Sequence, residues 1–180
     1  MSEFEYLAVF VSIVFGISVT HILAGVIRSI YRRQINETHF VLTAFFFLVL
    51  ILDWWTGFSW EKQEVWSVDL FIVIVMWAVA HYLAAITLYP PESAGVEQPF
   101  EYRRNWFLWA FIGVALMDIL QTAARGDLFS PRAYLPFVSH YVVVSSLAIF
   151  VNKPQFHRLM AWYLFLSTAT WTFVVRRFLE

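Results

Sequence analysis

Six ionisable side chains and one amide lie inside or at the ends of long apolar stretches of the sequence, where such groups are rare. They are His21, Asp53, Asp69, His81, Asp118, His140 and Gln121. A charged side chain near the centre of a bilayer costs roughly 2.5–3.5 kcal/mol on insertion scales, so groups of this kind are usually buried against protein and often mark a functional site. Carboxylates attract cations, and an imidazole that titrates near neutrality can hold or release a proton. We therefore look first for a cation or proton site among these residues.

The depth of these residues along the predicted spans sorts them into two groups. Asp53, Asp118 and His140 fall in the same outer third of three different spans, and Gln121 lies close to Asp118. We predict that these four residues form an ion or solute site for transport. A purely structural alternative places Asp53 at the level of the lipid headgroups and pairs Asp118 with His140. Asp69 lies near the outer end of its span.

His21 and His81 fall in the opposite, inner third, on the first and third spans. One histidine on each of two facing helices at equal depth is the minimum geometry for the axial ligands of a haem b. The alternative is that the two imidazoles form hydrogen bonds between helices. No haem-attachment motif accompanies them, and the sequence identifies no other metal or cofactor.

The positions of the apolar stretches predict an all-α, polytopic membrane helix bundle. The chain is 61% hydrophobic and 14% charged, whereas globular proteins average roughly 45–50% apolar and about 25% charged residues. A helix needs about 20 mostly apolar residues to cross the hydrocarbon core. About six stretches meet or approach this length: 6–27, 40–60, 68–88, 106–124, 134–151 and 160–175.

The connections between these stretches are short, so residues 1–180 should form a single transmembrane domain with no extramembrane domain. The N-terminus is acidic and lacks a basic region, so we expect the first span to be retained rather than cleaved. Arg28, Arg32 and Arg33 follow that span, which places the first loop in the cytoplasm and the N-terminus outside. The pattern is typical of small proteins of the bacterial inner membrane.

Tryptophan and tyrosine gather near the predicted span ends, where amphipathic rings favour the level of the lipid headgroups. These predicted interface anchors are Trp54, Trp55, Trp60, Trp66, Tyr89, Trp106, Trp109, Tyr134 and Trp162.

The sequence also contains a weak internal similarity between residues 1–90 and 98–180. A shift of 97 positions places Gly16 on Gly113 and Arg28 on Arg125. Three spans are an odd number, so a second copy would cross the membrane in the opposite sense, giving a 3+3 inverted repeat of the kind found in transporters. Small residues, among them Gly16, Gly25 and Gly113, predict close helix packing, with the first and fourth spans crossing near the molecular centre.

Several classes of function find no support in the sequence. The absence of cysteine excludes thiolate metal sites and cysteine nucleophiles, and no phosphate-binding glycine loop, HExxH or GxSxG motif occurs. A net charge of −1 without a basic stripe does not fit nucleic-acid binding. No enzymatic activity is predicted.

These observations favour a transporter or channel for a small ion or solute, acting in the lipid bilayer as an oligomer. Two alternatives stay open: an accessory or interaction subunit of a membrane complex, and a membrane redox component that binds haem b.

Overall fold

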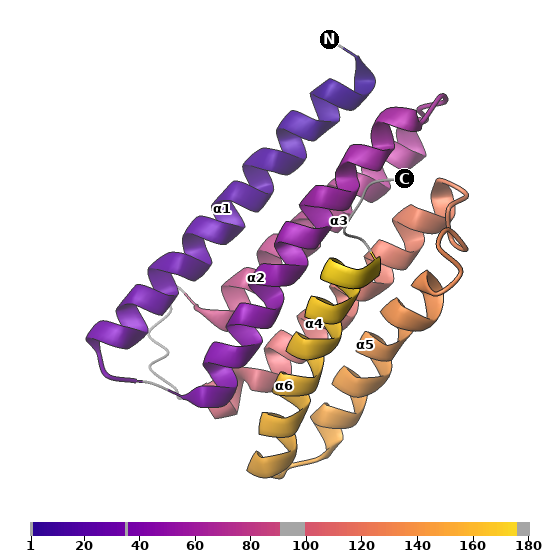
Figure 1. The fold of residues 1–180 in the computed structure, drawn as a ribbon. Coiled ribbons are helices and arrows are strands. Elements are labelled where there is room, and N and C mark those ends of the chain that lie inside the picture. The colour runs from indigo at the N-terminus through magenta and orange to yellow at the C-terminus, as the bar shows by residue number, and fades with distance from the viewer. Residues whose placement is uncertain (1, 35, 91–99, 176–180) are drawn as a thin grey trace.

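The computed structural model describes residues 2–34, 36–90 and 100–175, and within them every regular element is a helix. The helices run side by side, alternating in direction, as one bundle (Figure 1). The six α-helices are α1 (Glu3–Tyr31), α2 (Glu37–Gly57), α3 (Val68–Leu88), α4 (Phe100–Ala124), α5 (Tyr134–Phe150) and α6 (Pro154–Thr170). A 3-10 helix, η1 (Phe58–Lys62), continues α2, and a π-helical turn, η3 (Trp171–Val175), continues α6. The prediction of an all-helical fold is confirmed.

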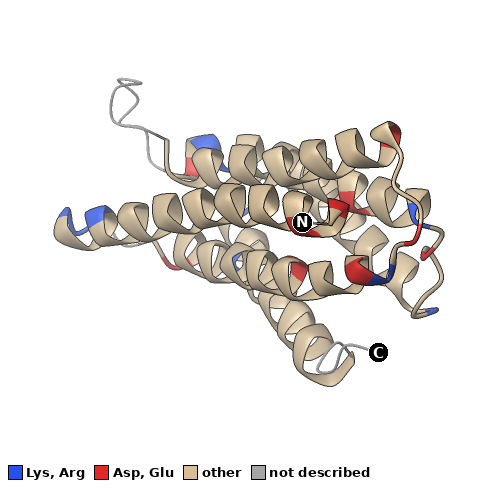
Figure 2. Ribbon diagram, turned by 90° about the horizontal axis from the view of Figure 1, so that it is seen from above, with Lys and Arg blue, Asp and Glu red and all other residues tan. Residues whose placement is uncertain are grey.

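Four helices are long and apolar enough to cross a membrane, namely α1, α2 together with η1, α3 and α4. Helices α5 and α6 have 17 residues each, which is somewhat less than the usual length of a span. Charged residues lie mainly at the helix ends and in the connections (Figure 2). Large apolar side chains such as Val9, Ile13 and Ile17 are at least half exposed on the outside of α1, as expected for a surface in contact with lipid.

The connections define two ends of the bundle. The α2–α3 and α4–α5 connections lie at the end drawn uppermost in Figure 1, which we call the upper end. The α1–α2 and α5–α6 connections lie at the lower end. Ser2, Asn36 and Ser67 each cap the first turn of the following helix by accepting a hydrogen bond from a backbone N–H group, the usual solution for the unpaired donors at a helix start.

Helix packing does not follow the predicted repeat. Helix α3 packs between α1 and α4, α5 packs on α4, and α6 packs mainly on α2. An inverted repeat would require α4 to pack on α6 as α1 packs on α3, but in the described residues α4 and α6 make no extended contact. Helices α1 and α4 make none either, so the prediction that the first and fourth spans cross near the centre is wrong.

The three predicted packing glycines have different surroundings. A side chain at Gly25 would meet the Tyr89 ring, with its Cβ only 2.2 Å from the Cγ atom, so only glycine fits there. A Cβ at Gly16 or Gly113 would meet nothing within 4 Å. These two positions therefore do not bring helices together, and the expectation that they do is wrong.

Aromatic rings fill the middle of the bundle. Phe45 of α2 meets Phe111 of α4 edge to face at a centroid distance of 4.9 Å, and Phe111 meets Tyr141 of α5 at 5.4 Å. Phe46 and Phe107 are fully buried beside them. This layer separates the polar groups near the upper end of the bundle from those near the lower end.

Candidate functional site

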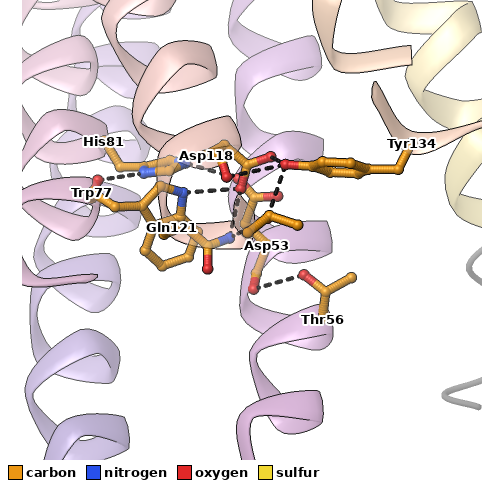
Figure 3. A network of polar contacts seen from close by, with 8 residues as sticks. Asp53, Thr56, Trp77, His81, Asp118, Gln121 and Tyr134 are labelled. Carbon is orange, nitrogen blue, oxygen red and sulfur yellow. Dashed lines mark hydrogen bonds and ion pairs between the residues drawn. The ribbon is translucent and has the colours of Figure 1, made fainter. Parts of the chain in front are cut away.

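The carboxylate of Asp118 on α4 is held by three hydrogen-bond donors from three helices (Figure 3). The indole Nε1 of Trp77 and the amide Nε2 of Gln121 each donate to Oδ1 at 3.1 Å. The Tyr134 hydroxyl at the start of α5 donates to Oδ2 at 2.7 Å. Since a carboxylate offers about four acceptor positions, the three donors among the described residues leave one position on Oδ2.

The second carboxylate, Asp53 on α2, pairs with His81 on α3. Oδ2 of Asp53 lies 2.8 Å from Nε2 of His81. Nδ1 of the same ring lies 2.8 Å from the carbonyl oxygen of Trp77, one turn earlier in α3. The His81 side chain is completely buried, whereas the Asp53 side chain is 14% exposed. Asp53 therefore connects a buried imidazole to an accessible space.

That space is a cavity of about 430 Å³ between α2, α4 and α5. Both carboxylates line it, and the contact of Asp53 with His81 is made through Oδ2. Phe111, Phe137, Tyr134, Tyr141 and Trp171 contribute aromatic walls. We call Asp53, Trp77, His81, Asp118, Gln121 and Tyr134 the carboxylate cluster.

Polar residues surround the opening of the cavity at the upper end. Lys62 and Ser130, which line the opening, are exposed there. Arg125, just after α4, donates to Gln121 Oε1 at 3.1 Å and forms an ion pair with Asp127 at 3.3 Å. Arg125 therefore links the end of α4 to the polar residues at the opening.

The structure brings three of the predicted transport residues together, since Asp53, Asp118 and Gln121 line one cavity. His140 lies elsewhere: its Nδ1 contacts the Phe137 carbonyl and its Nε2 is 3.4 Å from Ser167 Oγ on α6. The alternative pairing of Asp118 with His140 is therefore wrong, because other donors occupy Asp118. Asp69 is exposed in the first turn of α3.

The predicted pairing of His21 with His81 at one depth is not seen. His81 belongs to the carboxylate cluster, because its Nε2 lies 2.8 Å from Oδ2 of Asp53. His21 instead places Nε2 2.5 Å from the carbonyl oxygen of Tyr89. Both nitrogens of His81 are hydrogen-bonded, so haem ligation stays a prediction, and ligation through Nε2 would require His81 to leave Asp53.

His21 takes part in a second polar cluster, at the lower end. There His39 Nε2 lies 3.0 Å from the Leu88 carbonyl, and the Thr43 hydroxyl lies 3.0 Å from that of Tyr89. Leu88 and Tyr89 end α3, where the last carbonyls have no partner within the helix. The two imidazoles therefore cap α3 from the neighbouring helices. We call His21, His39, Thr43 and Tyr89 the histidine cluster.

Sequence reasoning missed Trp77 and Thr122 and assigned Tyr134 to the membrane interface. Tyr134 is buried, and its hydroxyl also lies 2.9 Å from Thr122 Oγ1. One signal could have found part of the site: Gln121, Thr122 and Arg125 follow Asp118 by three, four and seven residues. This spacing places them on one face of a helix.

Together these features define a class: an all-helical bundle with four helices able to span a membrane and a cavity that contains two carboxylates. Within the described residues no group of three or more histidine, aspartate or glutamate side chains is placed to hold a metal ion. Comparisons with protein-family models, with curated proteins and with solved structures found no match.

Proposed function

We propose that this protein binds a small cation in the cavity and carries it across the membrane. The observation that supports this proposal best is that Asp53 and Asp118 both face one cavity inside a bundle of membrane-length apolar helices. In an apolar bundle two carboxylates are unfavourable unless positive charge compensates them. A cation in the cavity would supply that charge, with Oδ1 of Asp53 and the free position on Asp118 as its contacts.

The cavity walls favour an organic ammonium ion over a divalent metal. A hard divalent cation such as Ca²⁺ takes 6–8 oxygen ligands, whereas an organic ammonium ion can use two carboxylates together with aromatic faces, which attract cations. Phe111, Phe137, Tyr141 and Trp171 line this cavity and would supply such contacts. The cavity volume of about 430 Å³ also falls within the range of roughly 300–1,000 Å³ for small-molecule sites.

Access from one end supports a transporter rather than an open channel. The cavity opens at the upper end, and Phe111, seven residues before Asp118 on α4 and thus about 10 Å lower, lies at its lower limit beside Tyr141. Transport then requires a second conformation that opens toward the lower end. Arg32 and Arg33 lie at the lower end, so the positive-inside rule would place the opening outside the cell.

In this proposal α5 and α6 also cross the membrane, giving six spans. Helix α5 of 17 residues is about 25 Å long, close to the hydrocarbon thickness of about 30 Å. Helix α6 is prolonged by η3. Helix α5 packs along α4 and α6 along α2, and both α4 and α2 are long enough to cross the membrane. This packing supports the proposal that α5 and α6 cross the bilayer beside them.

The test is uptake of radiolabelled tetraethylammonium and Rb⁺ into liposomes containing the purified protein. We expect uptake of tetraethylammonium to exceed that of Rb⁺, and Asp118→Asn to reduce it to the level of protein-free liposomes. The matched control is Asp69→Asn, which removes an exposed carboxylate outside the cavity. An Asp118→Asn protein that remains folded and transports as well as the unaltered chain would contradict the proposal.

A further inference from the structure

The hydrogen bonds of His81 determine where its protons lie. Nδ1 is 2.8 Å from the Trp77 carbonyl oxygen, and a carbonyl only accepts hydrogen bonds. Nδ1 must therefore carry a proton. In the neutral imidazole the other nitrogen, Nε2, is then an acceptor without a proton.

The contact between His81 and Asp53 consequently contains one further proton. Nε2 and Oδ2 of Asp53 are 2.8 Å apart, and neither a neutral Nε2 nor an ionised carboxylate can donate. The bond exists only if Asp53 is protonated and donates to Nε2, or if His81 is an imidazolium and donates to the carboxylate. In both cases the pair is neutral overall and holds one removable proton.

Loss of this proton changes both charge and geometry. The pair then carries one negative charge, and two lone pairs face each other across 2.8 Å, so the contact is no longer attractive. His81 is fixed by the Trp77 carbonyl and by the Phe15 ring, whose centroid lies 4.9 Å from that of the imidazole. The side chain that can turn is Asp53, which borders the cavity.

The surroundings allow a cation to take the place of the proton. Asp118 supplies a second carboxylate in the same cavity, where three donors hold it in place. The charged and titratable groups that line the cavity are Lys62 next to α2, Asp118 on α4, Arg125 and Asp127 after α4, and Tyr134 and Tyr141 on α5. Helix α1 contributes the apolar Phe15 against His81, and η3 contributes Trp171.

We propose that the Asp53–His81 pair is a proton site that exchanges with the bound cation. One monovalent cation enters the cavity, one proton leaves the pair for the cavity water, and the charge of the site is unchanged. This inference rests on the proposed function and adds that transport is cation–proton exchange. It assigns different roles to the two carboxylates: Asp118 contacts the cation, and Asp53 gains and loses the proton.

The experiment is calorimetric titration of the purified protein in detergent with tetraethylammonium, in two buffers of different ionisation enthalpy. The difference between the two heats counts the protons released. We expect about one proton per bound cation, and a Kd that weakens about tenfold for each pH unit of acidification while the pair is protonated. The titrations cover about pH 5 to about pH 8, where imidazole groups usually titrate.

Two variants remove the proton site while leaving Asp118. Asp53→Asn and His81→Gln should bind tetraethylammonium with no proton release and with a Kd independent of pH, and Asp69→Asn should behave like the unaltered protein. Binding without proton release by the unaltered protein would overturn this inference and leave the proposed function standing. If the unaltered protein did not bind tetraethylammonium, both this inference and the proposed function would be overturned. If Asp53→Asn and His81→Gln released as many protons as the unaltered protein, the proton site would not be the Asp53–His81 pair.

Discussion

The carboxylate cluster and the histidine cluster use the same kind of residue for different purposes. In the histidine cluster, His21 and His39 bond to backbone carbonyl groups that end α3. In the carboxylate cluster, His81 bonds on one side to a carbonyl and on the other to Asp53. A backbone carbonyl is held in position by the helix and does not ionise. A carboxylate side chain can bind or release a proton and can rotate. The first arrangement is suited to holding helices and the second to changing state.

The histidine cluster is tightly packed, whereas the carboxylate cluster borders a cavity. At the lower end the Tyr89 ring lies against Gly25 without room for one more carbon atom, and the Phe100 ring stacks on His39 at a centroid distance of 4.1 Å. None of the residues of the histidine cluster lines the cavity, whereas Asp53 and Asp118 both do. We infer that a cavity beside buried polar groups, rather than the number of those groups, distinguishes a functional site from a structural cluster in this bundle.

The largest effect on stability is expected for Gly25→Ala in the lower, packed region. The added Cβ would lie 2.2–2.6 Å from three atoms of the Tyr89 side chain, so Tyr89 must move away from Thr43. We expect a loss of about 3 kcal/mol, the upper end of the range for an overfilled core, measured by thermal unfolding in detergent.

The control for this substitution is Gly16→Ala on the same helix, where a Cβ would meet nothing within 4 Å. There alanine should be neutral or stabilising by up to about 1 kcal/mol, because glycine is a poor helix former. Equal effects at the two positions would mean that Gly25 and Tyr89 do not pack as described.

A smaller loss is expected for His39→Ala, which leaves the Leu88 carbonyl without its donor and removes the ring under Phe100. A buried polar group without a partner costs about 2 kcal/mol, and thermal unfolding would again measure it. The affinity of the folded fraction for tetraethylammonium should not change, since His39 lies outside the cavity. Thr20→Ala is the control, because Thr20 bonds only to its own helix on an exposed face.

Sequence reasoning predicted the helices well because each long apolar run has one favourable environment. It also placed Asp53, Asp118 and Gln121 together from their depth along the chain. It failed for His140, because depth says nothing about which neighbour a helix face meets, and α5 turns His140 toward α6. The errors concern the rotation of each helix about its axis and the choice of neighbouring helix. Neither can be read from the sequence of a single span.

Tyr89 and Tyr134 illustrate a second limit. A tyrosine at the end of a span suits the membrane interface, and it equally suits a buried hydrogen bond to a neighbouring helix. The structure places both in buried positions, with hydroxyl groups bonded to Thr43 and Asp118. Only the identity of the neighbouring helix separates the two possibilities.

The smallest effect on stability is expected for Tyr134→Phe, and this substitution distinguishes the two clusters most directly. It removes one of three donors to Asp118, and a hydrogen bond contributes about 1 kcal/mol to the free energy of unfolding. Without that donor the carboxylate is less firmly oriented, so binding of tetraethylammonium should weaken by a factor larger than any produced by His39→Ala. Tyr163→Phe, on the exposed side of α6, should change neither quantity. If Tyr134→Phe lowered stability while leaving affinity intact, the carboxylate cluster would be structural, like the histidine cluster at the other end.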